Sequence, residues 1–382
     1  MNTQIELTDA HHELRKEARE FAERELAPVA EEYEEAGEFP YELVKTIGEA
    51  GLHGVAYPEE YGGRGLDWRS FVVAIEELCR GWKLVGGEVS GANTLSAYSL
   101  YEYGSEWQKN QWLHGICTGE LLSALSMTEP EAGSDAGSMD TTAERDGDEY
   151  VINGHKVWTT FGSIADYLTV VARTGGDGPG GLSLIGIPEP TERDGFEVVR
   201  DIPCMEGDLA VETEIVYDDL RVPVKNLIGE EGEGFRYIME GLDLGRIGTA
   251  AQAVGMAQAA FEASRSFADE REQFNRPIRK FQGIGFKLAD MAMEIEASRM
   301  LSYRAADRYD QGLDTTKHAA MAKTYATDMA MDVTTEAVQI HGSRGYSKDY
   351  PVERYMRNAK GMQIYEGTNE VNRIVISREL YE

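Results

Sequence analysis

The chain has 382 residues, with 37 lysine and arginine side chains and 68 aspartate and glutamate side chains, so its net charge is −31. This length predicts two or three domains with ample buried core. The charge argues against nucleic acids and anionic membranes as partners. Because so many acidic groups repel one another unless salt screens them, we expect a cytoplasm with very high salt; an ordinary acidic enzyme is the alternative.

Several common classes of protein are not expected. Cys79, Cys117 and Cys204 are too widely separated for a disulfide framework. The N-terminal sequence MNTQIELTDAHHELRK lacks the apolar core of a secretory signal, and no segment approaches the roughly 18 apolar residues of a membrane span. No histidine pair has zinc-motif spacing and no C-x-x-C occurs. We therefore expect a cytoplasmic protein with no membrane span and no metal.

Residues 1–121 are predicted to form an N-terminal α-helical domain. Thr8 can cap a helix that runs towards Glu35, and Pro28 should divide that helix. Further helices are expected where apolar residues recur at helical spacing, over Tyr41–Ala50, Trp68–Cys79, Thr94–Tyr103 and Glu106–Cys117.

Residues 122–232 are predicted to form a middle β-domain, because short alternating runs lie between turn residues. Glu149–Ile152 and His155–Trp158 flank Asn153-Gly154, which predicts a hairpin with a two-residue turn. Further strands are expected over Tyr167–Arg173, Leu182–Ile187, Phe196–Arg200 and Glu212–Tyr217. The domain should be mostly antiparallel and barrel-like.

Residues 233–382 are predicted to form a C-terminal four-helix bundle. Long segments rich in alanine and methionine have the apolar spacing of antiparallel helices, and a final helix should begin after Thr368; the long segments are Ile238–Glu270, Ile278–Gln311 and Thr315–Ile340. The expected fold class is therefore α+β and multidomain, with helices, then an antiparallel β-barrel-like domain, then helices.

Four motifs suggest chemistry, and each has a purely structural alternative. MTEPEAGSD (127–135) could hydrogen-bond a flat heterocycle or phosphate, or could be an acidic turn. Trp158 with Thr160 could pack against a ring, or the tryptophan could belong to the core. REQFNRPI (271–278) offers Arg271 to a pyrophosphate, or merely a surface arginine. QIHGSRGY (339–346) could offer amides to phosphates, or could be a helix C-cap and turn.

The most informative segment is Tyr365-Glu366-Gly367-Thr368. Thr368 can cap the following helix, which leaves Glu366 on a turn where its carboxylate could be aimed into a cleft. Alone, an acid at a helix N-terminus is better explained by the helix dipole. The other four motifs favour the functional interpretation. The sequence has no Walker loop, Rossmann glycine fingerprint or G-x-S-x-G elbow, so a nucleotide fold or serine hydrolase is not expected.

Together, MTEPEAGSD, VWTTFG, REQF, QIHGSRGY and YEGTNE resemble the acyl-CoA dehydrogenase family of flavoenzymes. The resemblance covers essentially the whole chain, in the family's order and spacing, and the combination is highly specific. Ser126, Phe161 and Asn275 depart from the family's commoner residues. We expect these departures to adjust packing without abolishing flavin binding.

The resemblance implies that FAD is held between the β-domain and the C-terminal bundle. Thr128 would hydrogen-bond the isoalloxazine, Trp158 would cover the ring, and Thr160 would approach the reactive nitrogen. Further implied FAD-binding positions are Met127, Ser134, Thr368 and Glu370. The positions that would reach the FAD of a neighbouring subunit are Arg271, Phe274, Gln282, Gln339, Gly342 and Ser343. A homo-oligomer is therefore expected, commonly a tetramer built as a dimer of dimers.

The implied reaction is α,β-dehydrogenation of an acyl-CoA thioester to the trans-2-enoyl-CoA, with Glu366 as the catalytic base. Burial should raise the pKa of that carboxyl towards neutrality. Some relatives carry the base on another helix, at a position that is Gly245 here and cannot act. The implied substrate-binding positions are Ser134, Asp243, Arg246, Tyr365 and Gly367. For Asp243 and Arg246 the alternative is a helical ion pair.

The resemblance also implies electron-transferring flavoprotein as the electron acceptor. The segment Leu242–Gln258 looks closest to short-chain members, and Tyr98 and Tyr101 could shorten the acyl pocket. A glutaryl group is less favoured, because no arginine matches the one expected to bind its carboxylate. The alternatives are an acyl-CoA oxidase-like or fold-related flavin enzyme acting on another substrate, and a non-catalytic acyl-CoA-binding member.

Overall fold

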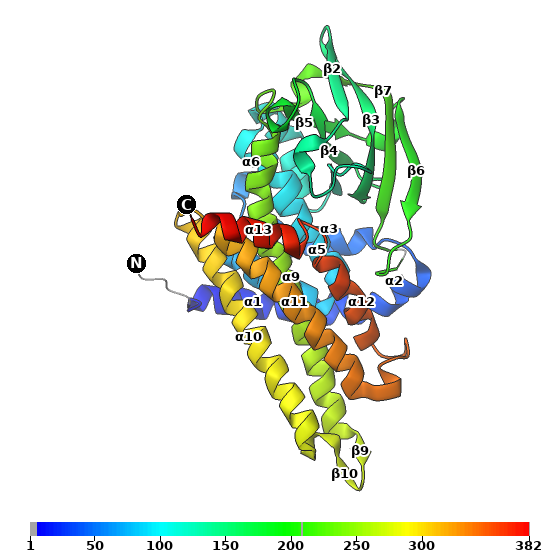
Figure 1. Ribbon diagram of the computed structural model, residues 1–382, viewed down its shortest axis with the longest axis vertical. Coiled ribbons are helices and arrows are strands. Elements are labelled where there is room, and N and C mark those ends of the chain that lie inside the picture. The colour runs from blue at the N-terminus through cyan, green and yellow to red at the C-terminus, as the bar shows by residue number, and fades with distance from the viewer. Residues whose placement is uncertain (1–5, 208, 382) are drawn as a thin grey trace. The chain divides into compact units, whose positions relative to one another are not determined.

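The computed structural model of the chain describes residues 6–207 and 209–381. Its packing divides the chain into two units (Figure 1). The helical unit comprises Met1–Tyr33, Asp67–Ser90 and Asp243–Glu382, and the sheet unit comprises Glu34–Leu66 and Gly91–Leu242. Each unit draws on more than one stretch of sequence, so the predicted boundaries after residues 121 and 232 stay predictions.

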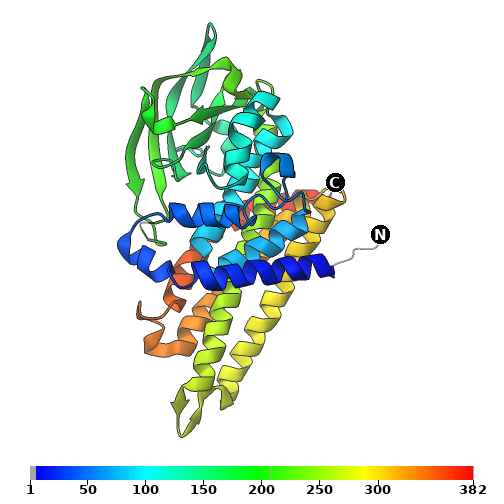
Figure 2. The ribbon, with the colours of Figure 1, turned by 180° about the vertical axis from the view of Figure 1, so that it is seen from behind.

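Among the described residues, the helical unit draws on three helices from the N-terminal part of the chain and five from the C-terminal part. Figures 1 and 2 show α10 and α11 running alongside each other, with the short β9–β10 ribbon at the far end of α9 and α10. The helices are α1 (Asp9–Phe21), α4 (Trp68–Gly81), α5 (Lys83–Gly91), α9 (Gly234–Glu270), α10 (Gln282–Asp310), α11 (Thr316–His341), α12 (Val352–Met362) and α13 (Asn369–Glu379). The ribbon pairs Glu272–Gln273 with Arg276–Pro277.

The start of α1 follows the predicted cap. The Thr8 hydroxyl accepts from the backbone N–H of His11, and the His11 ring bonds back to the Thr8 backbone. The other ring nitrogen of His11 lies 3.0 Å from Asp67, which caps α4 through the Ser70 N–H. The predicted division near Pro28 is also confirmed: a π-helical turn ends at Leu26, and α2 begins afresh at Ala30 (Ala30–Ala36).

Small residues let α9 approach the N-terminal helices closely. A Cβ added at Gly255 would lie 2.1 Å from the Glu76 carbonyl oxygen on α4, and one added at Gly248 would lie 2.3 Å from the Ser90 hydroxyl on α5. Helix α5 was not predicted, because its glycines obscure the helical pattern. Helix α12 was also missed.

The sheet unit contains a sheet of eight strands in the order β6-β7-β3-β2-β4-β5-β8, with β1 paired parallel to β4. Nearly all other pairing is antiparallel, as predicted. The strands are β1 (Ser123–Ser126), β2 (Thr142–Asp146), β3 (Glu149–Thr160), β4 (Tyr167–Arg173), β5 (Leu182–Pro188), β6 (Phe196–Ile202), β7 (Glu212–Pro223) and β8 (Leu227–Ile228).

The predicted Asn153-Gly154 hairpin is wrong. Both residues lie inside the continuous strand β3, and the real hairpin joins β2 to β3 through Gly147-Asp148, with φ of 67° at Gly147. Gly154 is required for close approach, since an added Cβ would lie 2.3 Å from the Thr141 hydroxyl. The strand has a register shift against β7 at this point, which is a β-bulge.

Short helices cover part of the sheet unit and precede its first strand. They are α3 (Tyr41–Glu49), α6 (Tyr98–Tyr103), α7 (Glu106–Gln108) and α8 (His114–Cys117), with π-helical turns at Ala92–Ala97 and Lys109–Leu113. The core of the sheet is formed by buried residues of β1, β2, β3, β4, β5 and β7, including Ile152, Val170, Ile185, Ile215 and Val222. Over the described ranges, no helix is long and apolar enough to cross a membrane.

Candidate active site

The turn between α12 and α13 carries Glu366. The Thr368 hydroxyl caps α13 by accepting from the Val371 N–H at 3.3 Å. Glu366 has a φ of 54° and Gly367 a φ of 82°, so both are left-handed. Glycine adopts this conformation readily, but it costs a glutamate about 1–2 kcal/mol. Contacts outside the turn must therefore hold it.

Those contacts come from Lys323 on α11 and from two asparagines of α13. The Lys323 ammonium donates to the Gly367 carbonyl and to Asn369 Oδ1, both at 2.9 Å. Asn372 Nδ2 donates to the same Gly367 carbonyl at 2.7 Å. Sequence analysis identified none of these residues. The available signal was a lone lysine in the buried stripe of an alanine-rich helix, beside Ala322 and Ala326.

The carboxylate of Glu366 is buried without a full complement of partners. Its Oε2 is closed to solvent and makes no hydrogen bond within the described chain. A Cβ added at Gly245 would lie 2.5 Å from this oxygen, so the position occupied by a base in some relatives is in contact with the carboxylate here. Burial raises the pKa of Glu366 to about 7 from its ordinary 4.5.

Three groups partly offset that burial by favouring the ionised form of Glu366: Thr249, Lys323 and Arg246. Thr249 lies close enough for its hydroxyl to stabilise the charge, but does not meet the geometry of a full hydrogen bond. Neither cation forms an ion pair with the carboxylate within 4.0 Å over the described residues. The carboxylate is therefore poised between its protonated and ionised states near neutral pH.

Asp243 and Arg246 form the ion pair that the structural alternative predicted. Arg246 Nη1 lies 2.7 Å from Asp243 Oδ1, and both side chains are largely buried. The other Asp243 oxygen accepts from Thr316 at 2.6 Å. Because the Arg246 Nε is buried and makes no hydrogen bond to a described residue, the guanidinium retains a free donor. A role for the pair in binding substrate stays a prediction.

The side chain of Tyr365, the residue before Glu366, is held by contacts from α9 and α5. Its hydroxyl donates to Gln252 on α9 at 3.2 Å, and the Lys83 ammonium lies 5.5 Å from the centre of its ring. Thus α5, α9 and α11 of the helical unit all contribute side chains around the turn. The structure places Arg246 near the turn formed by Tyr365, Glu366, Gly367 and Thr368, and the roles predicted for these residues stay predictions.

In the sheet unit, a buried ion pair holds the start of the MTEPEAGSD segment. The Lys156 ammonium donates to the Met127 carbonyl at 2.6 Å and to Glu129 at 2.9 Å. Glu129 also accepts from the backbone N–H groups of Asp140 and Thr141. Met127 and Thr128 are half-buried, whereas Ser134 is exposed.

A β-bulge turns the predicted flavin-facing residues of β3 outward. The register against β7 shifts between Lys156 and Thr159, and Trp158 takes a φ of 59°. As a result Trp158 and Thr160 are exposed, while Lys156 and Thr159 are buried. Trp158 is 53% exposed, so it is not a core tryptophan. The Thr160 hydroxyl donates to Glu212 at 3.0 Å.

Glu370, another predicted FAD residue, is exposed in the first turn of α13. The FAD residues predicted to reach a neighbouring subunit lie at the other end of the long helices, around the β9–β10 ribbon (Figure 1). Stacked rings of Phe267 and His341, 4.3 Å apart, join the ends of α9 and α11 there. Phe274 is 87% exposed on the ribbon. Arg271, Gln282, Gln339 and the Gly342–Ser343 turn lie at the helix ends around it. The structure does not bring this set to Glu366 within the helical unit.

These features fit a flat, phosphate-bearing cofactor. An exposed indole, two hydroxyls and a fixed loop suit a heterocyclic ring in the sheet unit. The half-buried Arg271 and the exposed Phe274 suit a nucleotide in the helical unit. A cleft of about 770 Å³ in the helical unit lies elsewhere, over paired charges such as Glu76, Glu77 and Arg299. Over residues 6–207 and 209–381, no group of His, Cys, Asp and Glu side chains could hold a metal ion.

Comparison with known proteins gives matches along the whole chain. Models of the acyl-CoA dehydrogenase N-terminal, middle and C-terminal domains match residues 8–120, 124–219 and 232–381. A short-chain specific acyl-CoA dehydrogenase of Clostridium acetobutylicum is 44% identical over 376 residues, 98% of this chain and 99% of that protein.

Two solved structures show the same architecture. Butyryl-CoA dehydrogenase from Megasphaera elsdenii has a TM-score of 0.95 and 41% identity, covering 100% of both chains. A chain from a structure of the electron transferring flavoprotein of Acidaminococcus fermentans has a TM-score of 0.95 and 45% identity, covering 100% of this chain and 99% of that one.

Proposed function

Because the chain belongs to the acyl-CoA dehydrogenase family, we propose that it oxidises a short-chain acyl-CoA thioester to the trans-2-enoyl-CoA, with FAD as its cofactor. One observation carries the proposal: Glu366 is a buried carboxylate whose pKa burial raises to about 7. A base with that pKa is half ionised at neutral pH and can take a weakly acidic proton. The short-chain preference is supported by the names of the relatives.

The residues act in three ways. The Glu366 carboxylate accepts the α-proton of the thioester, forming an O–H bond as the C–H bond breaks. The backbone N–H of Glu366, which bonds to no other described group, is available to the thioester carbonyl, where negative charge develops. Bound FAD would supply the acceptor for the β-hydrogen, which leaves with its electron pair. Met127, Thr128, Ser134, Trp158 and Thr160 would hold the cofactor, with Thr368 and Glu370 as further contacts.

We test this proposal by anaerobic titration of the FAD-loaded protein with saturated acyl-CoA thioesters of four to about sixteen carbons. Bleaching of the flavin absorbance by the short thioesters is the expected result. Bleaching only by long or branched thioesters would keep the reaction and change the substrate. A flavin band that no thioester bleaches would reject the proposal.

We further propose that the protein is a homotetramer in which each FAD is completed by a neighbouring subunit. Large apolar side chains are exposed on the helical unit, including Phe274 at 87%, Phe286 at 63% and Met293 at 63%. Phe286 and Met293 are seven residues apart on α10 and therefore share one face of that helix, and a contiguous exposed apolar patch marks an interaction surface. Light scattering should give four times the monomer mass, and Phe286→Glu should lower both the mass and FAD retention.

Electron-transferring flavoprotein is the proposed acceptor, supported by the family and by the structure from Acidaminococcus fermentans. An oxidase-like enzyme is the main rival. Slow reoxidation of the reduced flavin by air, with fast reoxidation by electron-transferring flavoprotein, is the expected result. Rapid reoxidation by air would favour the oxidase.

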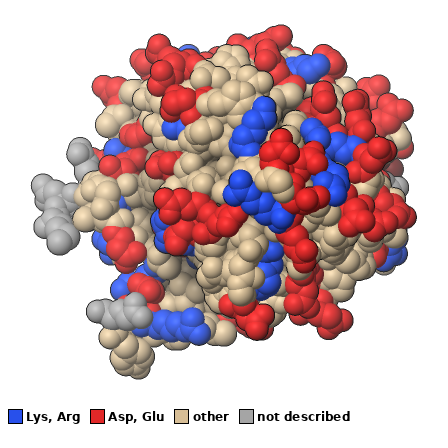
Figure 3. Space-filling model, turned by 90° about the horizontal axis from the view of Figure 1, so that it is seen from above, with Lys and Arg blue, Asp and Glu red and all other residues tan. Residues whose placement is uncertain are grey.

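A salt-rich cytoplasm remains our proposal for the working environment. Figure 3 shows acidic side chains spread over one face of the molecule, with fewer basic ones among them. With a net charge of −31, mutual repulsion should weaken the fold at low ionic strength. Melting temperatures measured from 0.1 to about 3 M KCl should rise with salt. Equal stability at both limits would reject the proposal.

A further inference from the structure

Lys323 is a buried lysine that the proposed chemistry does not by itself require. Lys323 is 0% exposed, on the buried face of α11. Taking an ammonium out of water is expensive, so such groups persist only where they are hydrogen-bonded and electrostatically compensated. Each Lys323 contact should therefore have a structural or chemical purpose.

Two of those contacts fix the turn that carries Glu366. The ammonium donates to the Gly367 carbonyl and to Asn369 Oδ1, both at 2.9 Å. Asn369 is itself held, because its Nδ2 donates to Thr327 at 2.9 Å and to Asp328 at 2.8 Å, also on α11. The turn is thus anchored to α11 immediately beside two left-handed residues.

The charge of Lys323 also faces Glu366. The groups that act on the Glu366 carboxylate are Thr249 and Arg246 from α9 and Lys323 from α11. The groups that act on Lys323 are Glu366, Arg246, Asp328 and Glu370. Burial lowers the pKa of Lys323 to about 8, and the negative charge of Glu366 works in the opposite direction. The two groups therefore influence each other's ionisation.

We propose that Lys323 is a positioning residue for the dehydrogenation: it holds the Glu366–Gly367 turn by its carbonyl and places a positive charge behind the base. This inference rests on the proposed function, in which Glu366 accepts the α-proton. The hydrogen bonds determine where the carboxylate lies, and the charge determines how readily it ionises. These two effects can be separated, because Asn372 bonds to the same carbonyl without carrying a charge.

The test compares kcat against pH for four FAD-loaded proteins: wild type, Lys323→Met, Asn372→Ala and Lys317→Met. The positive charge of Lys323 lowers the pKa of Glu366. Its removal in Lys323→Met should therefore shift the acid limb of the kcat profile to higher pH, by about one pH unit or more. Asn372→Ala should lower kcat about tenfold and leave the limb in place. Lys317→Met, on the same helix, removes a lysine that donates to the Glu379 carbonyl at 3.2 Å, away from the Glu366 turn, and should resemble wild type.

A Lys323→Met protein with reduced kcat but an unmoved acid limb would overturn the proposal, since Lys323 would then serve only the fold. If Lys323→Met does not fold, Lys323→Gln takes its place, because an amide can still donate to Gly367 without the charge. The pH dependence of unfolding, compared between each protein and the same protein carrying Glu366→Gln, reports the pKa of Glu366 without any turnover. Failure of wild type to bleach its flavin would reject the proposed function, while this unfolding comparison would still decide the role of Lys323.

Discussion

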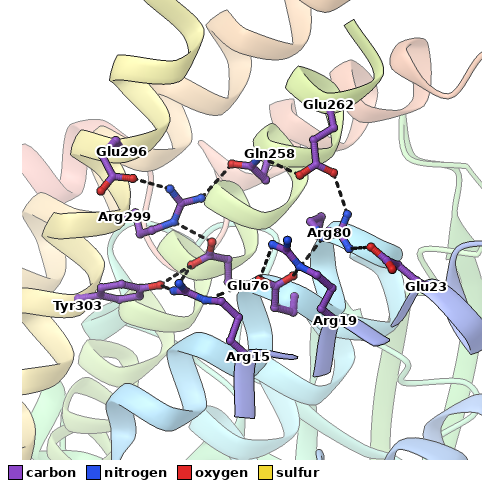
Figure 4. A network of polar contacts seen from close by, with 11 residues as sticks. Arg15, Arg19, Glu23, Glu76, Arg80, Gln258, Glu262, Glu296, Arg299 and Tyr303 are labelled. Atoms are coloured by element: carbon purple, nitrogen blue, oxygen red, sulfur yellow. Dashed lines mark hydrogen bonds and ion pairs between the residues drawn. The ribbon is translucent and has the colours of Figure 1, made fainter. Parts of the chain in front are cut away.

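Two regions of the helical unit bury carboxylates in opposite ways. Around Glu76 and Glu77 on α4, arginines and a tyrosine bond directly to the carboxylates, and Figure 4 shows these contacts as a connected network. Around Glu366, the nearest cations stay outside ion-pair distance and one oxygen has no hydrogen bond within the described chain. We call the first region the arginine network. Its carboxylates are Glu76 and Glu77, and their direct partners are Arg15, Arg19, Arg80, Arg299 and Tyr303.

The geometry of the arginine network explains why its charges suit a structural role. Arg19 bonds to both oxygens of Glu77 at 2.9 Å, and its pKa is raised first by that hydrogen bond. Glu76 accepts from Arg299 at 2.8 Å and from Tyr303 at 2.9 Å. The oxygens of these carboxylates are thus engaged in charge-assisted hydrogen bonds, which suits a structural role.

The comparison shows that burial alone does not make a base. Burial raises the pKa of the Glu366 carboxyl towards neutrality, and Lys323 and Arg246, which do not bond to it directly, offset that rise only in part. Lys323 illustrates the arrangement, because its hydrogen bonds go to Gly367 and Asn369 instead of to the Glu366 carboxylate. The same cation can therefore hold the turn and leave the base reactive.

The largest expected effect is on turnover. Glu366→Gln keeps the shape of the side chain but cannot accept a proton, so we expect kcat to fall by about a thousandfold, with FAD and acyl-CoA still bound. Stopped-flow bleaching of the flavin measures the step directly. Glu379→Gln, at the other end of α13, is the matched control and should keep wild-type activity. Near-normal turnover in Glu366→Gln would show that Glu366 is not the catalytic base.

The same substitution should stabilise the fold. The pKa of Glu366 is raised from 4.5 to about 7, so folding favours the protonated form, and stability is lost as pH rises through that interval. At pH 8 the ionised side chain should cost roughly 3 kcal/mol, which Glu366→Gln would recover, while at pH 4 the two proteins should be similar. Urea unfolding of both FAD-saturated proteins at the two pH values measures this. A difference that does not depend on pH would argue against an uncompensated carboxylate.

The arginine network should behave in the opposite way. Glu77→Gln leaves Arg19 and Arg80 without their shared carboxylate, and we expect a loss of about 2 kcal/mol, discounted because Arg19 is 42% exposed. Urea unfolding at fixed salt gives the value, and kcat of the folded protein should not change. Glu20→Gln is the control, since the Glu20 side chain is 62% exposed and its ion pair with Lys16 is long, at 3.7 Å. A stability gain in Glu77→Gln would remove the distinction between the regions.

Local signals predicted much of the fold. Thr8, Thr368 and Pro28 act at helix ends, where a few neighbouring residues decide the geometry, and all three predictions were confirmed. Asn153-Gly154 misled the prediction because a tertiary contact, Gly154 against Thr141, determines the need for glycine there. The hairpin formed instead at Gly147-Asp148.

The candidate site was predicted only where residues lie close in the sequence. Glu366 and its neighbours share one turn, but Thr249 and Lys323 reach it from α9 and α11, distant in the chain. A lysine among buried alanines is a visible anomaly in the sequence, yet its partners depend on how helices pack. The bulge that exposes Trp158 likewise depends on pairing with β7. The roles proposed for the FAD-binding residues stay predictions.

The smallest predicted effect tests how tightly the Glu366 carboxylate is packed. Gly245→Ala would place a methyl group 2.5 Å from Glu366 Oε2, so the carboxylate must move, and we expect kcat to fall about tenfold. Alanine favours a helix over glycine by about 1 kcal/mol, so a loss of activity here should occur without loss of stability. Gly285→Ala on α10 is the control, since its added methyl would meet only the Arg279 carbonyl oxygen at 3.9 Å. Unchanged kcat in Gly245→Ala would mean that the Glu366 carboxylate has room to shift. The difference between this site and the arginine network would then lie in how each carboxylate's charge is compensated, and not in how tightly each is packed.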